Sequence, residues 1–355
     1  MKVISVVGAR PQFVKLAPID HAFRQAGIEH QILHTGQHYD PLLSGSFFKE
    51  LGISEPDYRL SVGSASHGKQ TGMMLDGIEE ILLKSRPDWL LVYGDTNSTL
   101  AGAIAAVKLH IPVAHLEAGL RSFNREMPEE HNRVLTDHAS DLLLAPTEIA
   151  LAQLRREGLA ERSINVGDVM TDVLLQERDR VKGYPVPVPE KEGNYYVATI
   201  HRPQNTDNMG RLSQILSSFA KFDAPVFLLA HPRLQAIMKK NGGCVDTGNL
   251  RWNEPLPYPQ LVRAVMGAKA VITDSGGLQK EAFLLRVPCI TVRTETEWVE
   301  TVELGWNVLV EPGEAILEAV KSINPEPTSA QPYGDGKTAP RISAILRRYI
   351  LPSKS

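Results

Sequence analysis

Short apolar runs alternate with longer segments of helical periodicity along the whole chain. Consecutive apolar residues indicate strands buried on both faces, and helices between such strands are typical of a parallel sheet. In the first half, the runs that predict strands are residues 3–7, 30–34, 89–92, 113–115 and 142–145. The segments between them that predict helices include residues 72–85 and 99–109. This half is therefore expected to form a doubly wound α/β domain.

A proline-rich segment separates this series from a second one. Residues 181–194 carry alternating prolines, which cannot continue a helix and favour extended chain. We predict this segment as a linker between a Rossmann-like domain of residues 1–180 and a second Rossmann-like domain of residues 195–339. A length of 355 residues also favours two domains, because single cores stop growing below that size. The runs that predict strands in the second domain are residues 195–200, 226–230, 270–273, 289–292 and 307–310.

The net charge of the chain limits the classes of molecule that it is expected to bind. Lys and Arg number 38 and Asp and Glu number 41, a net charge of −3, so neither nucleic acid nor an anionic membrane is expected as the main partner. The first apolar run is too short for a signal peptide, and no other run reaches the roughly 20 residues of a membrane-spanning helix. Cys244 and Cys289 show neither metal spacing nor a nucleophile motif, which fits a reducing compartment. A cytoplasmic protein is therefore expected.

Ligands of open α/β sheets bind outside the carboxyl ends of the parallel strands. Two such domains that face each other form a cleft lined by the loops that follow those strands. The loops with candidate chemistry in this position are residues 8–15, 94–99, 115–133, 201–208 and 274–281. We expect the functional residues among these loops.

The most informative loop follows the apolar run 270–273. It begins Asp-Ser-Gly-Gly and opens a helix that carries Glu281 on its second turn. Backbone N–H groups at a helix start bind phosphate, and glycine lets a bulky anion approach the backbone closely. Ser275, Gly276 and Gly277 therefore predict a phosphate cradle, with Glu281 placed to accept hydrogen bonds from ribose hydroxyls. Taken alone, an ordinary strand-to-helix turn capped by Asp or Ser explains these residues equally well.

Carboxylates stand at strand or helix ends of the first domain. Asp95 has a sufficient structural explanation as a helix cap, worth about 1 kcal/mol. Glu117 follows a strand and has no comparable capping role, so a functional role is favoured. Glu129 and Glu130 lie at a helix start, which favours acids in any case, so one of the two is expected to be structural. Acids that share a site push their pKa values apart, which lets one pocket both donate and accept protons.

Cations and a histidine accompany these acids. Arg10 and Lys15 are placed to face an anion, although an ordinary solvated lysine is a reasonable alternative for Lys15. Arg133 adds a candidate substrate-binding cation near Glu129. His201 ends a strand of the second domain, where phosphate contact or proton transfer is as good an explanation as a plain rim position. Because metal-ligand spacings, a Gly-x-Ser-x-Gly elbow and a Walker loop are missing, the set indicates proton transfer on a nucleotide-linked substrate, without a metal or redox cofactor.

Six motifs occur in a fixed order over nearly the whole chain. They are GARPQFVK from Gly8, GDTNSTLA from Gly94, HLEAGLR from His115, PEEHNR from Pro128, TDSGGLQKE from Thr273 and PYGDG from Pro332. Together they resemble the non-hydrolysing UDP-N-acetylglucosamine 2-epimerases, a match far more specific than any single motif. The resemblance implies a GT-B arrangement, with two Rossmann-like domains facing a central cleft. It also implies a homodimer, and a C-terminal helix at residues 341–350, within the last segment 340–355, that crosses back to the first domain.

The resemblance implies inversion at C2 of a UDP-linked 2-acetamido sugar, through loss of the C2 proton and of UDP to give 2-acetamidoglucal, followed by return of both. The implied reaction interconverts UDP-GlcNAc and UDP-ManNAc for a surface polysaccharide. For Asp95, the implied catalytic role replaces the capping interpretation. The implied catalytic residues are Asp95, Glu117 and Glu129 as acid/base carboxylates, and His201 for the leaving UDP. The implied binding residues are Arg10 and Lys15 for substrate or diphosphate, Ser275, Gly276 and Gly277 for diphosphate, and Glu281 for ribose.

One segment departs from the family pattern. Where many members carry Glu-Arg-Pro-Glu, this chain has Glu297-Trp298-Val299-Glu300, and tryptophan cannot supply a charged fork to a phosphate or carboxylate. The exact sugar and the activation by UDP-GlcNAc reported for bacterial members therefore stay open. The Gly-Ala-Arg-Pro-Gln-Phe and Glu-Trp-Val-Glu variants also resemble a relative that acts on UDP-2,3-diacetamido-2,3-dideoxyglucuronate. A GT-B glycosyltransferase and a silent UDP-sugar sensor share the fold, but the three acids favour the epimerase.

Overall fold

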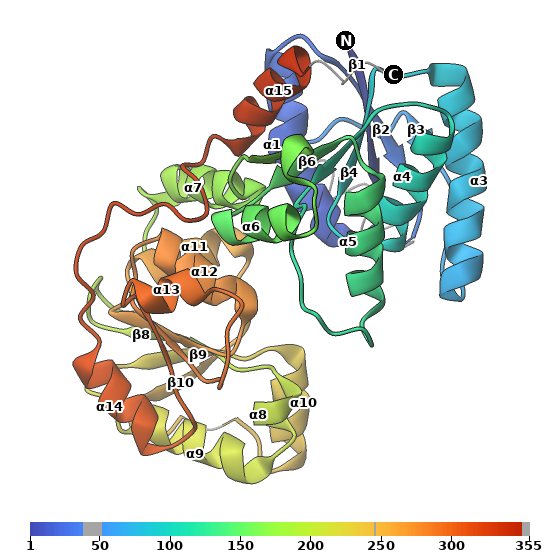
Figure 1. The fold of residues 1–355 in the computed structure, drawn as a ribbon. Helices are drawn as coiled ribbons and strands as arrows, with labels where there is room; N and C mark the ends of the chain where they lie inside the picture. Colours follow the sequence, from blue (N-terminus) through green and yellow to red (C-terminus); the bar gives the residue numbers. More distant parts are fainter. Residues whose placement is uncertain (38–51, 245, 350–355) are drawn as a thin grey trace. The chain divides into compact units, whose positions relative to one another are not determined.

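The computed structural model describes residues 1–37, 52–244 and 246–349. The chain forms two compact units, Met1–Val173 together with Gln331–Ser355, and Leu174–Ala330. Each unit is a parallel sheet with helices on its faces (Figure 1), which confirms the predicted α/β class. The chain passes from the first unit to the second inside helix α7 (Val169–Val181), between Val173 and Leu174, ahead of the proline-rich segment 181–194 predicted as the linker.

The first unit contains a sheet whose central strands are nearly continuous runs of buried apolar residues, as coverage on both faces requires. The strands are β1 (Lys2–Val7), β2 (Glu29–His34), β3 (Tyr58–Arg59), β4 (Trp89–Tyr93), β5 (Val113–Leu116), β6 (Leu142–Ala145) and β7 (Ser163–Asn165). All pair in parallel, in the order β3-β2-β1-β4-β5-β6-β7. The edge strands β3 and β7 are short and partly polar, so their sequences carry no apolar run, and they were not predicted.

Helices cover both faces of this sheet. Their bounds are α1 (Arg10–Gln25), α3 (His67–Ser85), α4 (Asn97–Lys108), α5 (Pro128–Ala139), α6 (Glu148–Arg156) and α15 (Thr338–Arg348), with a 3-10 turn at Ala160–Arg162. On one face, Phe13 and Leu16 of α1 share a buried cluster with Ile342 of α15. On the other face, Met74 of α3 and Ala105 of α4 belong to a second buried cluster.

The C-terminal helix α15 packs on the first unit, as predicted. The Asp172 carboxylate accepts hydrogen bonds from the N–H groups of Thr338 at 3.0 Å and Ala339 at 2.8 Å, which satisfies the start of the helix. Ala339 and Ile342 then bury their side chains against α1. The last residue predicted for this helix, residue 350, lies outside the described residues.

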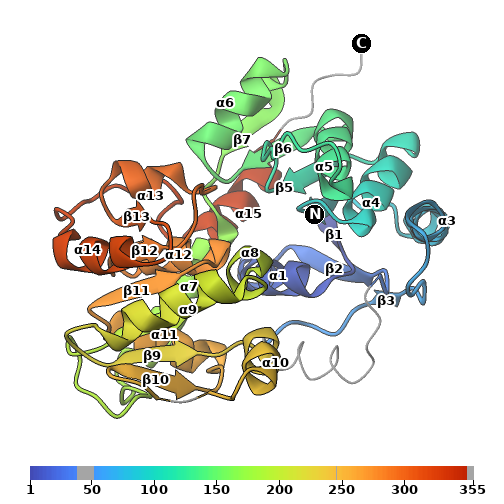
Figure 2. The same ribbon diagram turned by 90° about the horizontal axis from the view of Figure 1, so that it is seen from below.

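The second unit repeats this plan, and most of its elements are labelled in Figure 2. Its strands are β8 (Tyr196–Thr199), β9 (Val226–Leu229), β10 (Leu250–Asn253), β11 (Ala270–Thr273), β12 (Cys289–Thr291) and β13 (Asn307–Leu309). They pair in parallel, in the order β10-β9-β8-β11-β12-β13. The edge strand β10 reads LRWN, which is not an apolar run, and it was not predicted.

Helices flank the second sheet as well. Their bounds are α8 (Pro203–Thr206), α9 (Met209–Ala220), α10 (Pro232–Lys240), α11 (Tyr258–Met266), α12 (Gly276–Leu284), α13 (Val299–Glu303) and α14 (Glu314–Ser322). Leu212 of α9, Leu234 of α10 and Ile316 of α14 belong to the buried cluster on one face. Val265 of α11 and Leu278 of α12 belong to the cluster on the other face. The start of α12 therefore lies at the carboxyl end of β11, directly after a buried strand.

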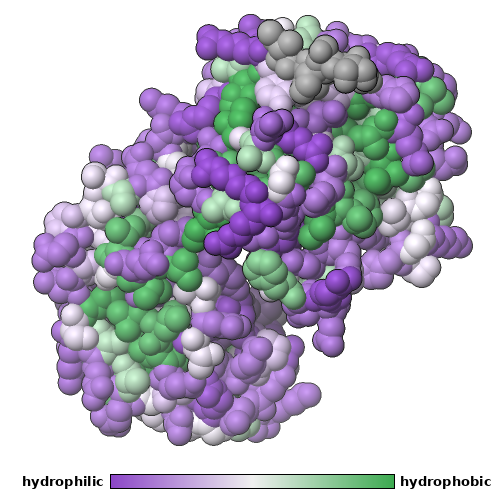
Figure 3. Space-filling model, in the orientation of Figure 1, coloured by the Kyte–Doolittle hydropathy of each residue, from purple (hydrophilic) through white to green (hydrophobic). Residues whose placement is uncertain are grey.

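The face of the molecule in Figure 3 is largely hydrophilic, with hydrophobic areas on both units. Exposed large apolar side chains include Met73 and Leu83 on α3 and Phe123 in the loop before α5. Scattered exposed apolar side chains are normal on protein surfaces. Among the described helices, none has both the length and the apolar composition needed to cross a membrane.

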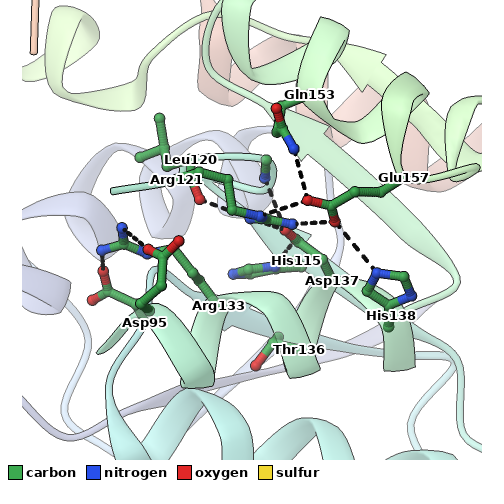
Figure 4. A network of polar contacts seen from close by, with 12 residues as sticks. Asp95, His115, Leu120, Arg121, Arg133, Thr136, Asp137, His138, Gln153 and Glu157 are labelled. Atoms are coloured by element: carbon green, nitrogen blue, oxygen red, sulfur yellow. Dashed lines mark hydrogen bonds and ion pairs between the residues drawn. The ribbon is translucent and has the colours of Figure 1, made fainter. Parts of the chain in front are cut away.

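A buried polar contact joins the ends of β4 and β5. His115 of β5 has its Nδ1 2.7 Å from Asp137 Oδ1 (Figure 4). Its Nε2 donates to the Gly94 carbonyl at 2.7 Å. The side chains of His115 and Asp137 are fully buried. Because Gly94 immediately precedes Asp95, this contact fixes the backbone from which the Asp95 side chain projects.

Asp137 of α5 is the centre of this network. Its second oxygen accepts from the Gly119 N–H at 3.0 Å and pairs with Arg121 at 2.8 Å, and Arg121 in turn pairs with Glu157 at 2.7 Å. Burial alone would raise the pKa of Asp137, but His115 and Arg121 hold it below its ordinary value. The carboxylate therefore remains ionised and ties the turn after β5 to α5.

Asp137→Asn should destabilise the first unit, because it leaves the buried His115 without its carboxylate and removes one of the two carboxylates that pair with Arg121. We expect the free energy of unfolding in urea at neutral pH to fall by about 3–5 kcal/mol. The folded pKa of Asp137 is depressed, so its contribution is present above the unfolded value of about 3.9 and is lost as the pH falls through the folded pKa. The difference between wild type and variant should therefore stay constant at neutral pH and shrink only in strong acid.

The matched control is Asp76→Asn, at an exposed position of α3. It should change the free energy of unfolding by no more than about 0.5 kcal/mol. Equal stability of Asp137→Asn and Asp76→Asn would contradict the role given to the network.

Candidate active site

Glu117 lies directly after β5, in a backbone conformation that residues other than glycine rarely adopt. Its φ is +69°, in the left-handed region, which costs a residue with a side chain about 1 kcal/mol or more. Its carboxylate forms an ion pair with the Lys15 ammonium of α1, and the exposed fractions of the two side chains are 13% and 17%. Backbone strain retained at such a position is typical of functional sites.

Several carboxylates lie near the Lys15 ammonium and affect its pKa. Burial alone would lower the pKa of its ammonium, but Glu117, and then Asp168 and Asp95, raise it above its ordinary value. Lys15 is therefore charged and largely buried, unlike the solvated helix lysine that was the alternative interpretation. Gly94 lies beside the pair, with a φ of +63°, and a Cβ there would lie 3.3 Å from Glu117 Oε2. Glycine suits both the turn and the close approach.

Asp95 follows β4, and it does not cap a helix. The N-cap of α4 is Thr96, whose hydroxyl accepts from the Thr99 N–H, so the capping interpretation of Asp95 is wrong. The Asp95 carboxylate instead forms an ion pair with Arg133 of α5 (Figure 4). Arg133 also donates to Glu130 at 2.9 Å. Arg133, predicted to bind substrate, is thus held between two carboxylates of the protein.

The two acids at the start of α5 have different surroundings. Glu130 is buried, and it accepts from the Ser122 N–H at 2.9 Å, the Ser122 hydroxyl at 2.8 Å and the Phe123 N–H at 2.9 Å. Burial alone would raise the pKa of Glu130, but these donors and Arg133 hold it below its ordinary value. Glu130 therefore fixes the loop before α5 and is the structural member of the pair. Glu129 is exposed.

Gln12 is a buried residue that the predicted set of site residues lacks. Its side-chain carbonyl accepts from the N–H groups of Gly8 at 2.8 Å and Ala9 at 3.0 Å, and its amide donates to the Tyr93 carbonyl at 2.8 Å. One side chain thereby ties the turn after β1 to the end of β4. The signal for it in the sequence is its position at the start of α1, where a Gln reaches back to the helix cap. Arg10, in the same turn, is exposed.

The second unit contains a cavity of about 340 Å³ at the carboxyl ends of its strands. Four of the predicted site residues line it, namely His201, Ser275, Gly277 and Glu281. A largely apolar wall with a few convergent polar groups suits a small ligand. The apolar side chains that line it are Leu229, Pro255, Leu256, Leu261 and Leu278.

His201 follows β8 and lines this cavity. Its Nδ1 lies 3.4 Å from Asp274 Oδ1, and its ring centroid lies 5.6 Å from that of His231. Burial lowers the pKa of His201 below its ordinary value; the charge of Asp274 opposes this effect, and those of His231 and Arg202 add to it. The ring is therefore neutral at neutral pH.

Asp274 joins the loops after β8 and β11. It is fully buried and accepts from the N–H groups of His201 and Arg202, each at 3.0 Å, and from the Asn205 amide at 3.0 Å. The sequence motif contains Asp274 but gives no sign of these distant donors. The N-cap of α12 is Ser275, so the capping interpretation of the elbow holds for that residue.

Two glycines open α12, although the fold itself does not require them. Neither Gly276 nor Gly277 has a positive φ. A Cβ on Gly277 would meet no atom of the described residues within 4 Å, and on Gly276 the nearest atom would be Glu297 Oε2 at 3.6 Å. Gly277 lines the cavity. Neither backbone conformation nor packing therefore demands glycine here, and the absence of a Cβ leaves this stretch of backbone open to close approach.

Glu281 lies on the second turn of α12, at the cavity wall. The Tyr258 hydroxyl donates to its Oε1 at 3.1 Å. Burial raises the pKa of Glu281 above its ordinary value, against the opposing effects of Tyr258 and Lys280. An ionised carboxylate has further lone pairs that can accept from ligand hydroxyls. Within residues 1–37, 52–244 and 246–349, no three His, Cys, Asp or Glu side chains gather closely enough to hold a metal ion.

Known sequences match this chain over nearly its whole length. The family model described as UDP-N-acetylglucosamine 2-epimerase matches residues 21–347. The chain is 46% identical to a UDP-N-acetylglucosamine 2-epimerase homolog of Methanococcus maripaludis, with 98% of this chain and 99% of the relative covered. It is 43% identical to the UDP-2,3-diacetamido-2,3-dideoxy-D-glucuronate 2-epimerase of Pseudomonas aeruginosa, with 98% and 100% covered.

Solved structures agree with these matches. The UDP-GlcNAc 2-epimerase of Methanocaldococcus jannaschii superimposes with a TM-score of 0.86 at 40% identity, with 98% of this chain and 99% of that chain covered. A second structure of that enzyme, in complex with UDP-GlcNAc and UDP, superimposes with a TM-score of 0.77 at the same identity and coverage. The resemblance drawn from the six motifs is thereby confirmed, and the chain belongs to the UDP-N-acetylglucosamine 2-epimerase family.

Proposed function

We propose that the protein inverts C2 of a UDP-linked 2-acetamido sugar and interconverts UDP-GlcNAc and UDP-ManNAc. One observation carries the proposal: Asp95 and Glu117 lie at the ends of the adjacent strands β4 and β5, and each is paired with its own cation. The named relatives are 2-epimerases of UDP-sugars, and one was solved in complex with UDP-GlcNAc and UDP. Both facts support a reaction in which protons move at C2.

We assign the uridine diphosphate to the cavity of the second unit. Its apolar wall suits the uracil ring, and the Glu281 carboxylate accepts hydrogen bonds from the ribose hydroxyls. The N–H groups of Gly276 and Gly277 at the start of α12 bind the diphosphate, aided by the helix dipole. Ser275 and His201 line the same cavity, and His201 is assigned to the phosphate that leaves.

The proton transfers are assigned to the acids of the first unit. A carboxylate removes the C2 proton, the C2–H electron pair forms the C1=C2 double bond, and the C1–O electron pair leaves with UDP. In the return step a UDP oxygen attacks C1, and the double-bond electrons take up a proton at C2 on the opposite face. Inversion therefore needs a proton-transfer group on each face, and Asp95, Glu117 and Glu129 are the candidates. Lys15 and Arg133 hold two of these carboxylates in place.

Three cations of the first unit are proposed to bind the substrate. Arg10 is the exposed first residue of α1, and we propose that it contacts an anionic part of the ligand. Lys15 and Arg133 are already paired with carboxylates, so contact with the substrate requires them to share or exchange these partners. We propose that the diphosphate or the sugar hydroxyls take part in that exchange.

A second substrate has one observation in its favour. The Pseudomonas aeruginosa relative, at 43% identity, is by its name an epimerase of UDP-2,3-diacetamido-2,3-dideoxy-D-glucuronate. The same acid/base steps serve both sugars, because the reacting C1 and C2 atoms carry the same groups. Incubation in D₂O with each UDP-sugar, followed by NMR at C2, separates the two. Deuterium at C2 together with the inverted epimer identifies the substrate, whereas no deuterium with either sugar would favour a glycosyltransferase or a UDP-sugar sensor.

We further propose a cytoplasmic location and a homodimer. Cys244 and Cys289 are both free thiols, which fits a reducing compartment. The homodimer rests on the family resemblance alone. Light scattering coupled to size-exclusion chromatography measures the assembly directly.

Asp95→Asn and Glu117→Gln should each abolish epimerisation, because each removes a proton-transfer group while it keeps the side-chain volume. We expect kcat to fall by about 10²- to 10⁴-fold in each variant, with an unchanged circular dichroism spectrum. Glu80→Gln, at an exposed position of α3, is the matched control and should keep normal activity. Near-normal turnover in both active-site variants would contradict the assignment of proton transfer to Asp95 and Glu117.

Glu281→Gln should weaken UDP binding and remove part of its pH dependence. The pKa of Glu281 is raised, so the wild-type carboxylate is protonated at a higher pH than a free glutamate, and the affinity for UDP should fall as the pH decreases through that pKa. At mildly alkaline pH the variant should bind UDP about 10- to 100-fold more weakly, as measured by calorimetry. Binding of 2′,3′-dideoxy-UDP should be nearly equal in both proteins, and an equal loss with that ligand would rule out the ribose contact.

A further inference from the structure

Trp298 lies in the loop after β12 and contacts the first turn of α12. Its indole N–H donates to the Gly276 carbonyl at 2.6 Å. The Lys280 ammonium lies 4.3 Å from the centre of the indole ring. The ring edge of Trp298 therefore meets the first residue of α12, and the ring face meets a residue one turn later.

We infer that Trp298 is a positioning residue that directs the Gly277 N–H toward the diphosphate, an inference that rests on the proposed function. The peptide group between Gly276 and Gly277 is planar and trans, so its C=O and N–H point in opposite directions. A hydrogen bond that fixes the Gly276 carbonyl therefore also fixes the Gly277 N–H. Gly277 lines the cavity that we assign to the nucleotide.

This peptide group lies in the first turn of α12, between two glycines. Glycine restricts the backbone less than other residues do, and the N–H groups of a first helical turn have no acceptor within the helix. The indole supplies a donor from outside the helix, which reduces that freedom before the ligand arrives. A carbonyl that accepts a hydrogen bond also polarises its peptide group, so the N–H becomes a better donor.

The backbone of Trp298 is itself anchored to the sheet. Its N–H donates to the Thr296 hydroxyl at 3.1 Å, and its carbonyl accepts from the Thr301 hydroxyl at 2.7 Å. The Thr301 hydroxyl in turn accepts from the Asn307 amide of β13 at 3.1 Å. Hydrogen bonds that lead to β13 therefore hold Trp298 in place, and its indole N–H in turn contacts the start of α12.

Trp298→Phe tests the inference, because it keeps an aromatic face for Lys280 and removes the N–H donor. The dissociation constant for UDP, measured by calorimetry, should rise about three- to tenfold, the effect of one hydrogen bond. The affinity for uridine, which lacks the diphosphate, should stay unchanged. The KM for the UDP-sugar should rise in parallel with the dissociation constant for UDP.

Trp306→Phe is the matched control. Trp306 packs edge-on against Phe283, and its indole nitrogen is buried with no hydrogen-bond partner among the described residues. Loss of that N–H should leave the affinities for both UDP and uridine at the wild-type values. Trp298→3-benzothienylalanine, which has the shape of tryptophan without the N–H, should reproduce the effect of Trp298→Phe and serves if the latter does not fold.

Each outcome separates the inference from the proposed function. Unchanged UDP affinity in the Trp298 variants would overturn the inference, and so would an equal loss of UDP and uridine affinity, which indicates general damage to the cavity. A wild-type protein that binds neither UDP nor a UDP-sugar would instead overturn the proposed function.

Discussion

In each unit, a buried carboxylate fixes the turns that carry the candidate site residues. Asp137 contacts His115 and the Gly119 N–H in the first unit, and Asp274 accepts the His201 N–H in the second. Hydrogen bonds to an ionised acceptor are about twice as strong as neutral ones, and a low-dielectric interior strengthens them further. The turns after neighbouring strands are thereby joined, directly by Asp274 in the second unit and through His115 in the first. The side chains on these turns are positioned before any ligand binds.

The two units use different groups for different tasks. The second unit offers backbone N–H groups at Gly276 and Gly277, which need little reorganisation when an anion binds. The first unit offers side chains, with Glu117 held in a strained backbone conformation and paired with Lys15. A reaction in which UDP leaves C1 and then returns requires the diphosphate to stay bound between the two steps. Proton transfer at C2 needs groups that can change their charge, and only side chains provide these.

Some features of the chain were predictable because they depend on local pattern. Central strands show as apolar runs, whereas the edge strands β3, β7 and β10 do not, since edges tolerate polar residues. Local pattern favoured the wrong helix cap at Asp95. Both Asp and Thr cap helices, and the N-cap of α4 is Thr96. Local pattern did not distinguish the structural role of Glu130 from that of Glu129, because both lie in the first turn of α5. Only the path of the preceding loop buries Glu130. Gln12 was not predicted because its contact with the end of β4, through the Tyr93 carbonyl, lies far away in the sequence.

The order of residues along the chain was enough to predict two α/β domains, the loops at the strand ends and the family. Those features follow from periodicity and from motifs within short segments. The tertiary structure alone decided the pairing of Lys15 with Glu117, 102 residues apart, and of Arg133 with Asp95, 38 residues apart. It also decided the contact of Trp298 with Gly276, a hydrogen bond to the first turn of α12. Such contacts depend on how packed elements bring distant side chains together, and no local period encodes that distance.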